Sequence, residues 1–104
     1  MKILFDQGTP APLRYELSGH SVSTASEMGW SNLDNGDLLS EAEKAFDLLI
    51  TTDQNLKYQQ NLAGRRISIL VLMTTSWPKI QRGISDIVAT IAAMQPGNFR
   101  ELSF

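Results

Sequence analysis

Residues 67–72 read ISILVL, an almost unbroken run of Ile, Leu and Val. Such a run is typical of a strand that is covered on both faces, as in a parallel sheet. Two shorter runs, residues 2–5 (KILF) and residues 47–51 (DLLIT), have the same apolar character. The three runs together predict a buried, mostly parallel sheet.

Helical patterns separate these strands. Leu13 and Leu17 are four residues apart after a proline-rich turn, and apolar residues recur at helical spacing after Pro78. The expected strands are residues 2–5, 20–24, 47–51, 67–72 and 99–104, and the expected helices are residues 10–18, 37–45 and 78–94. This alternation predicts a doubly wound or half-wound α/β fold whose crossovers are right-handed. A length of 104 residues fits one domain, residues 1–104.

The composition excludes several classes of site. The chain has no cysteine, which removes disulfides, thiolate nucleophiles and cysteine-ligated metals and fits a reducing compartment. The longest apolar stretch, residues 67–73, is too short to span a bilayer, and the first residues do not resemble a secretion signal. We therefore expect a cytoplasmic protein with no membrane contact.

Three acids are expected at one edge of the sheet. Asp6 follows the first strand and Asp53 follows the third, and the carboxyl ends of parallel strands meet at one edge, where ligands of open α/β sheets bind. Asp37 opens a helix that runs back from that edge. Clustered carboxylates repel each other unless a hard cation such as Mg²⁺ or Mn²⁺ lies between them. Such an ion can activate a water and steady a phosphodiester, so the spacing favours metal-dependent hydrolysis.

Each acid also has a structural explanation. Asp37 can simply favour the helix dipole, with Asp34 or Asn35 as the N-cap. Asp53 can be a turn residue. Of the two threonines before Asp53, Thr52 is the better candidate to orient water or phosphate, and Thr51 is better explained by its β-propensity.

Several segments in order carry a family resemblance. They are residues 1–10 (MKILFDQGTP), 19–22 (GHSV), 28–30 (MGW), 35–39 (NGDLL) and 49–56 (LITTDQNL). Their order and spacing resemble the PIN-like nuclease families, closest to short bacterial PIN-like proteins found beside antitoxin-like genes. The similarity covers about residues 1–72, and Trp77-Pro78 also resembles the family.

The resemblance implies a PIN-like αβα sandwich and a Mg²⁺- or Mn²⁺-dependent ribonuclease site. Asp6, Asp37 and Asp53 would be the catalytic metal ligands. Asn55 stands where a further acid often follows the third motif, and it would hydrogen-bond to a ligand or to a metal-bound water without adding charge. A cognate antitoxin protein and a homodimer are further expectations of the resemblance. Glu27 is an unplaced candidate for a fourth carboxylate.

The net charge of −2 argues against nucleic-acid binding by bulk charge. Residues 57–82 nevertheless hold five cations and no acid: Lys57, Arg65, Arg66, Lys79 and Arg82. Lys57, Arg65 and Arg66 are the candidates to hold RNA phosphates near the acids. Trp30 and Tyr58 can stack on bases, although such residues more often belong to a core or an interface.

Three functions remain open from the sequence. The first is a metal-dependent endoribonuclease, the toxin half of a toxin–antitoxin pair. The second is a non-catalytic interaction module that uses the Trp30 region and the last helix. The third is a metal-dependent phosphatase acting on small phosphate esters.

Overall fold

The apolar run at residues 67–72 forms β4 (Ser68–Leu72), which is buried along its whole length. The computed structural model describes residues 1–104. The other strands are β1 (Lys2–Phe5), β2 (Ser21–Thr24), β3 (Leu48–Thr51) and β5 (Phe99–Leu102). The helices are η1 (Ala11–Glu16), α1 (Asn35–Glu43), α2 (Leu56–Gln59), α3 (Trp77–Arg82) and α4 (Ile84–Ala93).

The five strands form one sheet in the order β2-β1-β3-β4-β5, and every pair is parallel. The expectation of a mostly parallel sheet is therefore confirmed, and the sheet is parallel throughout. The chain leaves β1 toward β2 on one side and later returns to place β3 on the other. The strand order thus reverses between β1 and β3, the point at which doubly wound sheets bind ligands.

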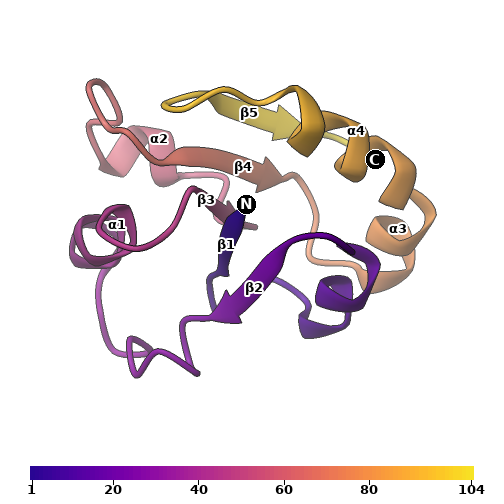
Figure 1. The fold of residues 1–104 in the computed structure, drawn as a ribbon, viewed down its shortest axis with the longest axis horizontal. Coiled ribbons are helices and arrows are strands. Elements are labelled where there is room, and N and C mark those ends of the chain that lie inside the picture. Colours follow the sequence, from indigo (N-terminus) through magenta and orange to yellow (C-terminus); the bar gives the residue numbers. More distant parts are fainter.

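Helices cover both faces of the sheet, which gives three layers (Figure 1). Side chains alternate in direction along a strand, so each strand contributes to two separate clusters. One cluster packs strand residues such as Phe5 and Ile50 against η1, α3 and α4. The other packs Leu4 and Leu49 against α1 and α2.

The last crossover differs in hand from the others. The β3–β4 and β4–β5 connections step in the same direction across the sheet, but α2 lies on one face and α3 and α4 lie on the other. The first three crossovers share one hand and the β4–β5 crossover has the other. The expectation that all crossovers are right-handed is therefore wrong. This crossover places α3 and α4 on the face of the sheet that otherwise only the six-residue η1 covers.

Two expected helices also differ in detail. The first is a 3₁₀ helix that begins after Pro10. The long helix expected over residues 78–94 is two helices that meet at Gly83, which is buried against the ring of Phe104. The edge strand expected near the end of the chain is confirmed as β5. None of the helices has the length and hydropathy that crossing a bilayer requires.

Candidate functional site

Asp6 is held rigidly at the carboxyl end of β1. Its backbone N–H donates to the carbonyl of Ile50 at 3.2 Å, which ties it to β3. Its Oδ1 accepts from the backbone N–H of Thr9 at 3.1 Å and from the Thr9 hydroxyl at 2.8 Å, and its Oδ2 accepts from the Thr51 hydroxyl. A carboxylate offers about four lone-pair sites, so these donors fix its orientation and leave about one site open.

Thr51 links the ends of the two strands. It is buried at the end of β3, where its hydroxyl donates to Asp6 and accepts from the backbone N–H of Asp53 at 3.0 Å. The explanation of Thr51 by β-propensity alone is therefore wrong. Sequence reasoning missed this role because either threonine before Asp53 could have faced the site.

Asp53 is oriented by two asparagines. Its Oδ1 accepts from the backbone N–H of Asn55 at 2.9 Å, and its Oδ2 accepts from the side-chain amide of Asn35 at 2.8 Å. Asn35 also donates to Gln59 at 3.1 Å, which joins the start of α1 to α2. Asn35 was not among the expected site residues. The same signal that marked Asp37, the start of a helix at this edge, applies equally to Asn35.

Asp37 lies apart from this network. It is exposed in the first turn of α1, and its backbone N–H donates to Asp34 Oδ1 at 2.8 Å. Asp34 is thus the N-cap, as the structural explanation of this segment requires. No group of three or more Asp, Glu or His side chains is gathered closely enough to hold a metal ion. The structure therefore joins Asp6 to Asp53 and does not bring Asp37 into the same cluster.

Two adjoining cavities open beside Asp6, one of about 170 Å³ and one of about 320 Å³. Both are lined by Asp6 and Gln7, and by Ala25 and Ser31 of the loop after β2. Gln7 donates from its side chain to the carbonyl of Ser31, which holds this loop against the site. The largest cavity, about 440 Å³, lies at the amino edge of the sheet, away from the acids.

Trp30 lines the smaller cavity but is also part of the core. Its ring meets Phe46 edge-on, with ring centres 6.0 Å apart, and packs against the buried cluster beneath α1. The structural interpretation of Trp30 therefore accounts for most of its contacts. Tyr58, by contrast, is 77% exposed.

Thr52 approaches the site through Gly8. A Cβ on Gly8 would lie 2.5 Å from Thr52 Oγ1 and 3.8 Å from Asp6 Oδ1, so only glycine fits between them. The Thr52 hydroxyl therefore lies on the same glycine that Asp6 adjoins, and its role toward water or phosphate stays a prediction. Asn55 meets Asp53 through its backbone, and its residue is exposed.

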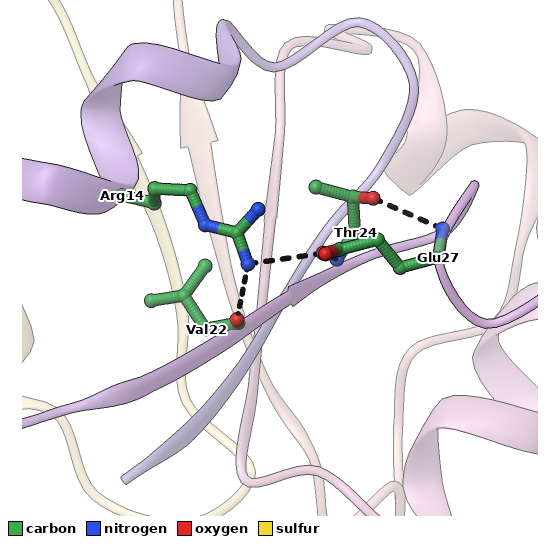
Figure 2. Close-up of polar contacts among 4 residues, drawn as sticks. All are labelled: Arg14, Val22, Thr24 and Glu27. Atoms are coloured by element: carbon green, nitrogen blue, oxygen red, sulfur yellow. Dashed lines mark hydrogen bonds and ion pairs between the residues drawn. The ribbon is translucent and has the colours of Figure 1, made fainter.

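Glu27 holds the loop after β2, part of which lines the two cavities, through the polar contacts drawn in Figure 2. Arg14 Nη2 lies 3.0 Å from Glu27 Oε1 and 2.7 Å from the Val22 carbonyl, while Glu27 accepts from the backbone N–H of Thr24 at 2.9 Å. The hydrogen bond from Arg14, followed by that from Thr24, lowers the pKa of Glu27 below its ordinary value. These contacts occupy Glu27 in positioning the loop after β2.

The expected phosphate-binding cations are not grouped beside the acids. Arg65 and Arg66 directly precede β4, at the amino edge, and Arg65 pairs with Glu43 at 3.3 Å. The expectation that these two arginines lie near the acids is wrong. The reason is that the segment after α2 carries the chain back across the sheet before β4 begins. Lys57 pairs with Glu101 at 3.0 Å, and that hydrogen bond raises the pKa of Lys57.

Comparison of the chain with protein-family models, with curated proteins and with solved structures finds no match.

The donor set itself can be tested against a hard cation. Asp6 and Asp53 supply carboxylates, and the Thr52 hydroxyl supplies a neutral oxygen beside Gly8. Mg²⁺ keeps several waters and needs only one or two protein carboxylates, so the oxygens present fit such an ion.

Proposed function

We propose that the chain is a divalent-metal-dependent endoribonuclease of PIN-like type, with Asp6 and Asp53 as its central acids. The observation that carries the proposal is the Thr51 hydroxyl, which joins the two acids where the strand order reverses. A carboxylate pair at this point of a parallel sheet lies where such folds bind their ligands. When bound, Mg²⁺ or Mn²⁺ supplies Lewis acidity and a water poised for in-line attack on a phosphodiester.

The chain's own groups then orient the two acids. Thr9 and Thr51 fix Asp6, and Asn35 fixes Asp53, so both carboxylates are preorganised before a substrate arrives. Asp37 lies two residues after Asn35 in α1 and therefore on a different face of the helix, so the proposal gives the central role to Asp6 and Asp53. The loop held by Gln7 would limit access of bulk water from one side.

The test is cleavage of single-stranded RNA by the pure protein with Mn²⁺, Mg²⁺ or EDTA. We expect ion-dependent cleavage that falls at least about a hundredfold in Asp6→Asn and in Asp53→Asn. Asp47→Asn is the matched control. Asp47 lies before β3 at the amino edge, where its Oδ2 accepts from the Lys2 N–H at 2.9 Å. An asparagine at this position still offers an oxygen to that N–H. Full activity of Asp6→Asn, or cleavage that EDTA does not affect, would contradict the proposal.

The toxin role and the homodimer belong to the same proposal, because the same resemblance suggests both. Expression of the chain should arrest growth in a host that tolerates the Asp6→Asn variant. Light scattering of the pure protein measures its mass directly. Turnover of a chromogenic phosphate ester without RNA cleavage would instead favour the phosphatase hypothesis.

One observation favours the second candidate, a non-catalytic interaction module. Asp37 does not join Asp6 and Asp53 in one cluster of three acids, and protein donors already occupy much of Asp6. This function predicts a stable protein complex that Asp6→Asn and Asp53→Asn leave unchanged. Binding that those variants abolish would count against it.

A further inference from the structure

Two cations within residues 57–82, the stretch without Asp or Glu, indicate a second site. The chain has nine Lys and Arg residues, and four of them, Arg14, Lys44, Lys57 and Arg65, form ion pairs. Five cations therefore lie outside ion pairs. They are Lys2, Arg66, Lys79, Arg82 and Arg100.

Only Lys79 and Arg82 of these five lie at the edge that carries Asp6 and Asp53. They belong to α3, which follows the carboxyl end of β4. The next helix, α4, runs back to the amino edge, where Gln95 accepts a hydrogen bond from Ser68 at the start of β4. Lys79 and Arg82 are three residues apart and share one face of α3.

A cavity of about 250 Å³ lies beside these two cations. Its other lining residues are Gly83, Asp86 and Phe104. Phe104 follows β5, so it also lies at the carboxyl edge, and its ring rests on Gly83, where a Cβ would come within 2.4 Å of the ring. Phe104 as a whole stays 41% exposed. The cavity thus combines a partly exposed phenylalanine with two cations outside ion pairs.

We propose that Lys79, Arg82 and Phe104 form a nucleotide-binding subsite for single-stranded RNA, on the same sheet edge as Asp6 and Asp53. This inference rests on the proposed ribonuclease function and extends it by naming how the substrate is held. Lys79 and Arg82 contact backbone phosphate, and Phe104 stacks on a base, the combination by which proteins hold single strands. An acidic peptide would use the cations but would leave the ring without a stacking partner.

The negative charge of Asp86 should weaken phosphate binding at this subsite, which provides a test. Asp86 lines the same cavity, so the side chains of the lining carry two positive charges and one negative charge. Removing the acid should therefore strengthen phosphate binding, whereas removing either cation should weaken it. Opposite effects from neighbouring exposed positions cannot arise from a general loss of folding.

The experiment is fluorescence anisotropy with a short labelled single-stranded RNA in EDTA, which separates binding from cleavage. Lys79→Gln with Arg82→Gln should lower affinity at least tenfold and reduce the salt dependence of log K by about 1.4, roughly 0.7 for each phosphate. Phe104→Ala should lower affinity by about fivefold or more. Asp86→Asn should raise affinity. The charge-matched control is Lys2→Gln with Lys44→Gln, away from this edge.

Three results would overturn the inference: equal weakening by the control pair, no effect of Phe104→Ala, or tight binding of a polyglutamate peptide in place of RNA. Failure of the ribonuclease proposal looks different. In that case RNA binds through Lys79 and Arg82, but no divalent ion produces cleavage. Cleavage lost in Asp6→Asn with RNA binding indifferent to Lys79 and Arg82 would instead contradict only the subsite.

Discussion

The hydroxyl of Thr51 donates a hydrogen bond to the carboxylate of Asp6, across the boundary between β3 and β1. The same oxygen accepts from the backbone of Asp53 at 3.0 Å. One buried side chain therefore sets the relative position of the two acids that the sequence places at this sheet edge.

Replacing Thr51 with valine should disturb both acids. The change removes a donor from Asp6 and leaves the N–H of Asp53 without its partner, so we expect a loss of about 1–3 kcal/mol in the free energy of unfolding. Urea denaturation measures it. Thr90→Val is the control, since the Thr90 hydroxyl bonds only to the carbonyl of Asp86 within α4. Equal effects of the two variants would show that the link between the acids has no special weight.

Asn35→Asp tests whether this edge responds to divalent ions. The variant replaces the amide that donates to Asp53 with a second carboxylate, and the two would repel each other. We expect a lower melting temperature in EDTA and a recovery on adding Mg²⁺ or Mn²⁺, measured by calorimetry. A deficit that the ions do not change would argue against cation binding at this position.

The Glu27–Arg14 pair should make the free energy of unfolding fall at acid pH. Because the folded-state pKa of Glu27 is lowered from the ordinary 4.5, its contribution is complete above that pH. It is lost as the pH falls through the lower, folded-state value. Glu27→Gln should therefore flatten the decline of stability below about pH 4.5, and paired urea titrations across pH measure this. The same decline of stability at acid pH in the parent protein and in Glu27→Gln would contradict this role of Glu27.

The face of α4 that packs on the sheet can be checked by a pair of neighbouring variants. Ile87 is fully buried in the cluster beneath α4, whereas Val88 is 44% exposed. Ile87→Ala should cost about 2–5 kcal/mol of unfolding free energy, and Val88→Ala should cost well under half of that. Similar costs at both positions would mean that α4 does not pack as described.

The sequence alone determined the sheet and the location of two acids. Strand runs such as residues 67–72 are local signals, because burial on both faces demands continuous apolar side chains. Asp6 and Asp53 follow such runs directly, and parallel geometry then requires their strand ends to share an edge. No packing information was needed for that step.

Tertiary structure decided what the side chains do at that edge. Whether Asn35 or Asp37 faces Asp53 depends on the rotation of α1, which is set by how Leu38 and Leu39 pack beneath it. The hand of the last crossover depended on which face still lacked cover. The same long-range packing separated Arg65 from the acids and brought Lys79 to their edge. Such outcomes depend on contacts between distant segments, which local periodicity does not encode.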